Sequence, residues 1–201
     1  MKISDVKTCF KIADVSWDGK GTKLSFDYLE NLKDENGNDL PSSILKENIS
    51  RVYLIVVDGI IKKIGCSEDK GGMKGTLSIY KDGGVKGRPS IRSFGIWYFL
   101  FHAITKGHKI EFYMIYQENF SAKVKGLFGY HNVKNASISP KLLEECCTID
   151  YRSVENNNFP DWNIQEQASD WPTEIKQQHA KIMEESSKKK IAKGRKEAKR
   201  A

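Results

Sequence analysis

The sequence lacks the features that mark several common classes of protein. No apolar run approaches the roughly 18 residues that a membrane-spanning helix needs, and the first 15 residues have no apolar core typical of a signal peptide. The four cysteines include no CxxC pair, which disfavours zinc and dithiol chemistry. The glycine-rich segment 65–75 does not match the phosphate-binding pattern GxxxxGK[ST]. We therefore expect a cytoplasmic protein with free thiols and no membrane partner.

The positive charge is concentrated at one end of the chain. The formal net charge is +7, and residues 186–201 contain eight Lys or Arg and one Glu, so this tail supplies all of it. Residues 1–185 are formally neutral. A basic tail favours polyanions because binding releases their counterions, but a solvated tail has the same composition. Composition therefore permits nucleic-acid binding without establishing it.

Hydrophobic patterning predicts an α+β domain. The expected strands cover residues 21–29, 51–57, 60–65 and 109–117, and a clear Asp58-Gly59 turn joins the middle two into a hairpin. The expected helices cover 91–105 and 139–152, with a short one near 76–81 and an amphipathic stretch over 173–185. We expect a small, mostly antiparallel three-stranded sheet, the hairpin plus a third strand, flanked by helices and followed by a basic C-terminal tail.

The turn of this hairpin decides whether Tyr53 and Lys63 meet. A two-residue Asp58-Gly59 turn pairs Tyr53 with Ile64 and leaves Lys63 on the opposite face. A three-residue turn with Gly59 in the left-handed conformation pairs Tyr53 with Lys63. The second arrangement places an ammonium beside a phenol, which lowers the pKa of the phenol and suits it to act as a general base. An ordinary amphipathic edge pair with a solvated Lys63 fits the same spacing.

The hairpin residues resemble the GIY-YIG nuclease superfamily. The first motif is present as Arg51-Val52-Tyr53 and the second as Lys63-Ile64-Gly65, in which Lys replaces the usual Tyr, as in restriction enzymes of the superfamily that contain KIG. Phage members of the superfamily are similar in two further motifs. These are Lys-Ile-Glu-Phe-Tyr at 109–113 and Trp-Asn-Ile-Gln at 162–165. The resemblance implies an N-terminal extension with a strand (1–50), a catalytic core (51–165) and a helical, basic C-terminal segment (166–201).

The resemblance also implies catalytic roles. Tyr53 activates the attacking water as general base, directly or through the neighbouring Lys63. A glutamate on the late helix, Glu144 or alternatively Glu145, binds one divalent cation, Mg²⁺ or Mn²⁺, which polarises the scissile phosphate. Asn163 braces the site or contacts the backbone. Glu144 follows two leucines, as the family glutamate does, and is preferred here.

The catalytic cation is less tightly defined by the motifs. The family places an arginine shortly after the second motif, where this chain has Lys74, and Lys74 lacks the bidentate fork of a guanidinium. Arg92, at the start of the apolar helix, is the preferred substitute. Arg88, with Lys70 and Lys86 of the Gly- and Lys-rich loop, is expected to contact the DNA backbone.

These features together predict a metal-dependent endonuclease that hydrolyses phosphodiester bonds in double-stranded DNA. A restriction enzyme and a phage DNA-degrading enzyme fit the sequence equally. Each single-metal site cuts one strand, so a homodimer or higher homo-oligomer is expected. A noncatalytic nucleic-acid-binding module that uses the basic tail and the Gly/Lys loop is the alternative.

Overall fold

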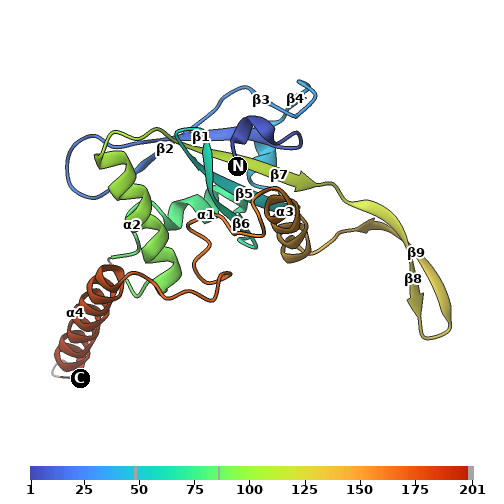
Figure 1. Ribbon diagram of the computed structural model, residues 1–201. Helices are drawn as coiled ribbons and strands as arrows, with labels where there is room; N and C mark the ends of the chain where they lie inside the picture. Colours follow the sequence, from blue (N-terminus) through green and yellow to red (C-terminus); the bar gives the residue numbers. More distant parts are fainter. Residues whose placement is uncertain (48, 86, 199–201) are drawn as a thin grey trace.

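The computed structural model shows an α+β fold built on one main antiparallel sheet (Figure 1). The structure describes residues 1–47, 49–85 and 87–198. The strands are β1 (Phe10–Ser16), β2 (Ser25–Tyr28), β3 (Leu32–Lys33), β4 (Asp39–Leu40), β5 (Ser50–Val57), β6 (Ile60–Cys66), β7 (Ile110–Gln117), β8 (Phe120–Gly126) and β9 (Gly129–Ala136). The helices are α1 (Gly72–Ile79), α2 (Ile91–Thr105), α3 (Pro140–Val154) and α4 (Thr173–Ala198), with short 3-10 turns η1 (Ile3–Asp5) and η2 (Ser42–Leu45).

The main sheet has five strands in the order β2-β1-β7-β5-β6, so the predicted number of three is wrong. The hairpin β5–β6 and the strand β7 are present as expected, and residues 1–50 supply the two further strands. A register shift between Lys11 and Ala13 interrupts the regular pairing of β1 with β7. Because this bulge breaks the strict alternation of buried and exposed residues, the pattern of β1 is hard to recognise in the sequence.

The hairpin β5–β6 has a register that neither simple turn predicts. Val57 pairs with Ile60 across a two-residue turn in which Asp58 and Gly59 both have positive φ, 48° and 79°. Of the two turns that the sequence left open, the two-residue turn is therefore the one present. A bulge then shifts the pairing, so that Tyr53 faces Gly65 and Ile55 faces Lys63. Directly opposed residues share a face, so the bulge returns Lys63 to the face of Tyr53, diagonally across the two strands.

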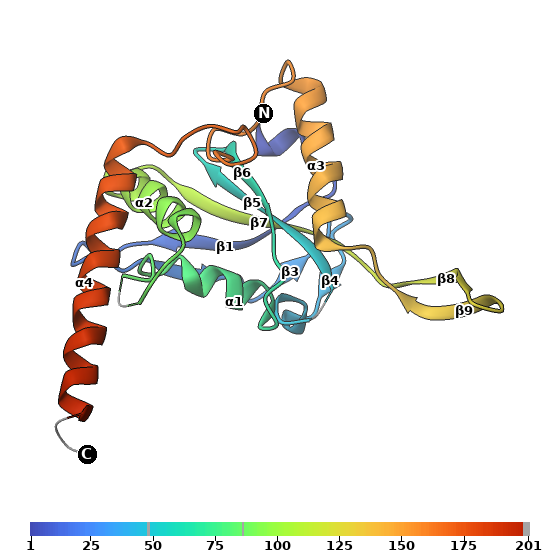
Figure 2. The same cartoon turned by 90° about the horizontal axis from the view of Figure 1, so that it is seen from below.

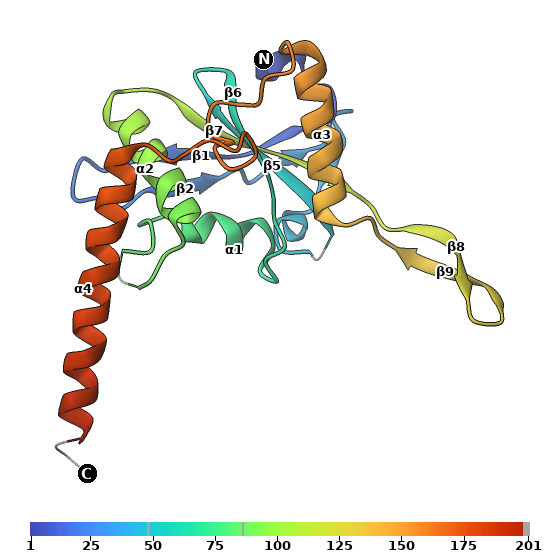
Figure 3. The ribbon, with the colours of Figure 1, turned by 60° about the horizontal axis from the view of Figure 1, so that its bottom comes forward.

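The two faces of the sheet have separate cores. Alternate residues of β5 such as Ile55 and Val57 pack with residues of α1 and α2, among them Met73 and Phe94, in the larger core. The other face packs against α3 and the N-terminal segment, with Tyr151 buried at its centre. Figures 2 and 3 show α2 and α4 side by side, while α3 lies apart from them near the end of β5 and β6. The hairpin β5–β6 thus lies between the helices that complete the site.

Both predicted long helices are present, and each begins at a serine cap. The Ser90 side chain accepts a hydrogen bond from the Ser93 N–H at the start of α2. Ser139 accepts one from the Leu142 N–H at the start of α3, where Pro140 occupies the first turn. Such caps satisfy backbone donors that have no partner within the helix. They fix where each helix starts, and so the position of the charged side chains in its first turns.

The basic segment does not form a separate tail within the described residues. The amphipathic stretch predicted to end near residue 185 continues as α4 to Ala198. Lys, Arg, Glu and Ala are favourable helix formers, so this composition favours a helix. Among the described residues, no helix is both long and apolar enough to cross a membrane.

A second hairpin, β8–β9, projects from the body and is absent from the sequence-based expectations (Figure 1). It forms its own two-stranded sheet between β7 and α3. Its central residues are exposed on both faces, so they do not show the polar and apolar alternation that identifies a half-buried strand.

Candidate active site

Four chemically different side chains from separate elements converge at the free edge of the sheet. Tyr53 lies on β5, Lys63 on the edge strand β6, Arg92 in the first turn of α2, and Glu144 on α3. Glu144 approaches from the helix on one face, while Tyr53 and Lys63 belong to the opposite face. The edge of β6 is therefore where groups from both faces meet.

Tyr53 is fixed by its neighbours on the sheet and on the adjoining loop. A Cβ atom on Gly65 would lie 2.5 Å from the Tyr53 ring, so only glycine at this position of the KIG motif leaves room for the phenol. The Tyr53 hydroxyl lies 2.8 Å from that of Tyr80, within hydrogen-bonding distance. Burial raises the pKa of Tyr53 well above its usual value, and the neighbouring Tyr80 adds to the effect. Tyr53 is therefore a neutral phenol at neutral pH.

Lys63 is a buried lysine with altered acidity. Its side chain is only 1% exposed. Burial lowers the pKa of Lys63 to about 8, against the opposing attraction of the Glu166 carboxylate, while the positive charge of Arg92 lowers it further. A fraction of Lys63 is therefore neutral near pH 8 and able to accept a proton, which a solvated lysine is not.

Glu144 is buried and held in its ionised form. One carboxylate oxygen accepts the Cys66 N–H at 3.2 Å, and the other accepts the ammonium of Lys141. Burial opposes the charge, yet the bond from Lys141 and the contact with Cys66 lower the pKa of Glu144 below its usual value. Glu145, the alternative metal ligand, is exposed. The structure thus brings Glu144, rather than Glu145, to the edge of β6.

Arg92 is a cation that lies close to two carboxylates. Its guanidinium lies 3.3 Å from Glu166 and 3.9 Å from Glu144. Although burial opposes the charge, the Tyr53 hydroxyl and the two carboxylates raise the pKa of Arg92. Its side chain is 38% exposed, whereas that of Glu144 is 3% exposed. Arg92 is therefore more accessible to an incoming phosphate than Glu144 is.

Asn163 supports the edge strand. Its side-chain amide accepts the Ile64 N–H at 2.9 Å and donates to the Ile64 carbonyl at 2.8 Å. The Trp162 N–H donates to the carbonyl of Lys62, the residue that the bulge leaves unpaired. Because Asn163 is fully buried, both of these bonds replace contacts with water. The Trp-Asn-Ile-Gln motif therefore covers the backbone of the edge strand that carries Lys63.

The other basic residues predicted for the site lie outside this cluster or beyond the described residues. The Lys74 ammonium lies 4.8 Å from the centre of the Tyr28 ring, on β2. Arg88 donates to Ser187 of α4 at 2.8 Å, and Lys70 is exposed on the loop before α1. Lys86 lies outside the described residues. Arg92 rather than Lys74 is thus the cation placed beside the glutamates.

Two residues of the cluster were not predicted from the sequence. Tyr80 follows α1 and Glu166 follows the Trp-Asn-Ile-Gln motif. Glu166 directly follows the Trp-Asn-Ile-Gln motif, so the position of that motif indicates Glu166 as a candidate site residue. Tyr80 lies in a Lys- and Gly-rich segment with no recognisable pattern, and only its contact with Tyr53 identifies it.

The donor set suits a hard divalent cation. Mg²⁺ typically takes one or two protein carboxylates and completes its shell with water and phosphate oxygens. Within the part of the chain that the structure describes, no group of three or more His, Cys, Asp or Glu could enclose a metal. A lone buried carboxylate such as that of Glu144 would fit only an ion that keeps most of its water. Lys141, which contacts the outer oxygen of Glu144, is 66% exposed and free to move away.

The chain is thus an α+β domain with a charged site at the edge of its sheet. No protein-family model and no curated protein matches the sequence. Similar solved structures include a mutant of bacteriophage T4 EndoII, with 13% identity and a TM-score of 0.48 over 82% of this chain and 99% of that one. They also include restriction endonuclease HPY188I in complex with product DNA, with 18% identity and a TM-score of 0.43 over 80% and 84%. One is a phage protein and the other a restriction endonuclease, the two kinds of protein that the motifs resemble. At these identities and TM-scores the likeness concerns only the path of the backbone. The function of this protein has to be argued from its own side chains.

Proposed function

We propose that this protein is a divalent-metal-dependent endonuclease that hydrolyses phosphodiester bonds in duplex DNA. The observation that supports this most is the convergence of buried Glu144, partly exposed Arg92 and the buried pair Tyr53 and Lys63 at one sheet edge. A buried carboxylate beside an accessible guanidinium suits a phosphate held with a metal ion. A phenol on the same face of the hairpin as a lysine of lowered pKa suits proton transfer.

Arg92 binds the scissile phosphate in this proposal. The guanidinium can donate two parallel hydrogen bonds to phosphate oxygens and stabilise the charge that develops on them. Its present anionic partner is Glu166, at 3.3 Å. A phosphate must therefore take the place of Glu166, and the pair keeps Arg92 oriented until DNA binds.

Tyr53 and Lys63 move the proton of the attacking water. Because the pKa of Tyr53 is raised, its hydroxyl accepts a proton only if it releases its own. Lys63 in its neutral form accepts that proton, as its lowered pKa of about 8 allows. The water oxygen bonds to phosphorus and the bond to the leaving oxygen breaks, while the water proton passes to Tyr53 and the Tyr53 proton to Lys63.

Glu144 holds the metal ion in this proposal. Glu144 would hold Mg²⁺ or Mn²⁺ there, and the ion would supply polarisation of the phosphate and stabilisation of the leaving oxygen. The hydrogen bond from the Cys66 backbone orients the carboxylate and anchors it to the strand that carries Lys63. One such site cuts one strand, so cleavage of both strands calls for a homodimer or larger homo-oligomer.

The proposal is tested with neighbouring glutamates on the same helix. Glu144→Gln is expected to lower the nicking rate on supercoiled plasmid with Mg²⁺ or Mn²⁺ by about a thousandfold, as loss of a charge-stabilising catalytic group does. Glu145→Gln has the same charge change at an exposed position and is expected to retain activity. Thermal unfolding of both variants checks the fold. If the wild type shifts DNA yet nicks none of a varied set of plasmids, the protein is a noncatalytic binding module instead.

A further inference from the structure

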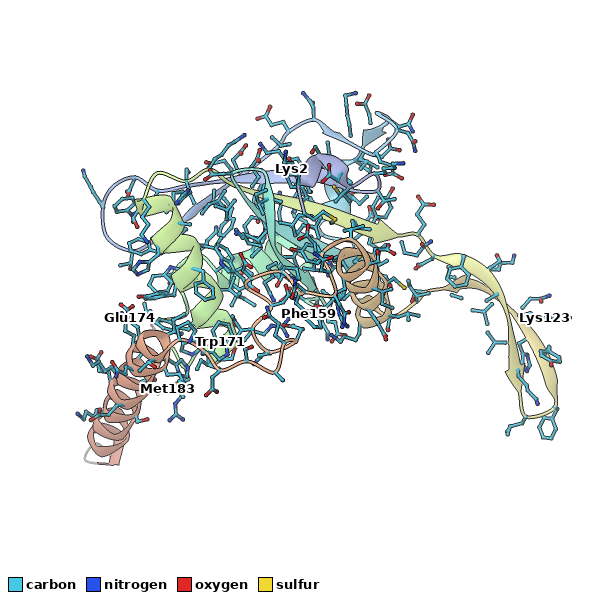
Figure 4. The ribbon with its side chains drawn as sticks, viewed as in Figure 1. Lys2, Lys123, Phe159, Trp171, Glu174 and Met183 are labelled. Carbon is cyan, nitrogen blue, oxygen red and sulfur yellow. The ribbon has the colours of Figure 1, made fainter. Side chains whose placement is uncertain are left out.

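The hairpin β8–β9 is a projecting arm with no packing function in the body. Its two strands pair with each other and with no other strand in the described residues. Figure 4 shows Lys123 on this arm, well away from the helices and the main sheet. From Phe120 to Ala136, only Ala122, Gly126 and Ala136 are partly covered, and every other residue is exposed. A two-stranded ribbon of this kind gains little stability from its own side chains, which indicates that they serve a partner.

The register divides the arm into two chemically different faces. Lys123 lies opposite Asn132 and Lys125 opposite Tyr130, so these four side chains share one face. Strand alternation places Lys134 on that face as well. The opposite face carries small and apolar side chains with one histidine: Ala122, Val124, His131 and Val133.

The lysine face has no acidic counterpart. No Asp or Glu occurs anywhere from residue 119 to residue 143. A ribbon with three lysines on one face and no carboxylate complements a row of phosphates. A second copy of the chain could cover the apolar face, but its own arm offers no acidic partner for these lysines.

The tip of the arm is apolar and fully exposed. Leu127 is 95% exposed and Phe128 is 100% exposed, in the turn between Gly126 and Gly129. Nucleic-acid-binding proteins use Leu and Phe wedges to enter the minor groove and unstack a base step. Lysines along a ribbon that ends in such a pair therefore combine backbone contacts with an apolar group for the bases.

We propose that the hairpin β8–β9 is a DNA-binding arm. Its lysine face lies along the phosphate backbone, and Leu127 and Phe128 insert at the bases in the minor groove. The inference rests on the proposed function for its substrate, duplex DNA, and adds how that substrate is held. The arm leads directly into α3, and Glu144 follows Ala136 by eight residues. The base of the arm is thereby joined to the helix that carries the carboxylate, while the lysine face and the tip extend away from the body.

The test compares two triple variants with the same loss of charge. Lys123, Lys125 and Lys134 are changed to Gln in one protein, and the exposed Lys7, Lys20 and Lys23 are changed to Gln in the control. Binding to a duplex oligonucleotide is measured by fluorescence anisotropy without divalent metal over a range of salt concentrations. Each lost phosphate contact lowers the slope of log K against log salt by about 0.9, so the arm variant is expected to lose about 2.7. The control is expected to keep the wild-type slope.

A single substitution at the tip tests the wedge. Phe128→Ser is expected to weaken binding several-fold and to reduce the bend of a doubly labelled duplex measured by energy transfer, while the salt slope stays at its wild-type value. Because the residue is fully exposed, this change leaves the fold intact, which circular dichroism verifies. If the variant bends the duplex as much as the wild type does, Phe128 does not act as a wedge.

Two outcomes overturn the arm as a DNA-binding element. One is an arm triple variant with the same slope and affinity as the control. The other is sedimentation in which Phe128→Ser dissociates an oligomer while DNA binding by each protomer is unchanged, which assigns the arm to a second copy. If the wild type binds DNA through the arm but cleaves none, the proposed nuclease function is wrong and the proposed role of the arm stands. If the protein cleaves DNA and the arm variant behaves as the control does, the nuclease function stands and the proposed role of the arm is wrong.

Discussion

At the scale of the residue, the burial of Lys63 links function to a cost in stability. An ammonium that is 1% exposed loses most of its hydration when the chain folds. The lysine retains its charge only because Glu166 and Glu144 are close enough to offset part of this loss. The lowered pKa that suits Lys63 to proton transfer has the same physical origin as the destabilisation.

This cost predicts a stabilised but inactive variant. Lys63→Met keeps a similar shape and removes the buried charge. A pKa lowered from 10.5 to about 8 corresponds to about 3 kcal/mol in favour of unfolding at neutral pH. The variant is therefore expected to have a higher melting temperature and no DNA cleavage. Lys62→Met, at the neighbouring half-buried position, is the matched control. If Lys63→Met is no more stable than the wild type, the buried charge of Lys63 does not destabilise the fold.

The same pKa predicts how activity and stability depend on pH. The folded protein releases the Lys63 proton near pH 8, whereas the unfolded chain holds it up to about 10.5. The unfolded state binds more protons in this window, so Lys63 makes stability rise with pH from about 8 to 10.5. Cleavage that needs neutral Lys63 rises through pH 8 and then levels. A rate that falls across pH 8 indicates that the charged form is the active one.

At the scale of the element, β6 is an edge strand covered on its free side by side chains and by a loop. An open edge exposes unpaired backbone groups and can slip in register. Trp162 donates to the carbonyl of Lys62, Asn163 bonds the N–H and carbonyl of Ile64, and Glu144 accepts from the N–H of Cys66. The register that returns Lys63 to the face of Tyr53 therefore depends on residues remote in the sequence.

Removing this support is expected to affect both stability and catalysis. Asn163→Ala leaves the buried N–H and carbonyl of Ile64 without partners, at a cost of about 1–3 kcal/mol for each. The free energy of unfolding from urea denaturation is expected to fall by several kcal/mol, and activity to fall even where the protein is folded. Asn158→Ala, an exposed asparagine in the turn after α3, is the control. Full activity in a folded Asn163→Ala protein excludes a bracing role.

At the scale of the whole molecule, positive charge lies at two extremities. The arm β8–β9 extends from one side, and α4 extends from the other towards the basic C-terminal residues (Figure 2). The first turns of α4 pack on the body through Ile175, which is fully buried. The basic end, as far as Ala198, thus belongs to α4, which is anchored at its start.

This arrangement predicts the effect of removing the basic end. Deletion of residues 186–201 removes eight Lys or Arg and one Glu and leaves the anchored turns in place. Nonspecific DNA affinity is expected to weaken and its salt dependence to flatten, while the melting temperature changes little. A full-length protein with the tail lysines changed to Arg keeps the charge and serves as control. A salt slope unaltered by the deletion makes this segment irrelevant to DNA binding.

The sequence by itself determined the local elements of this protein. The apolar helix 91–105, the capped helix that starts at Pro140 and the hairpin with its Asp58-Gly59 turn follow from periodicity, caps and turn residues. It also identified Tyr53, Lys63, Arg92 and Glu144 as candidates. These signals act over a few residues, so they can be recognised in a single sequence.

Only the tertiary structure decided how those candidates meet. The bulge at Lys62, which sets the face of Lys63, depends on Trp162, a residue 100 positions away. The choices of Arg92 over Lys74 and of Glu144 over Glu145 depend on which side chain reaches the edge of β6. The exposed arm shows no burial pattern and was missed for that reason. Long-range contacts and burial are properties of the folded chain, and they determine which side chains lie beside the hairpin at the candidate site.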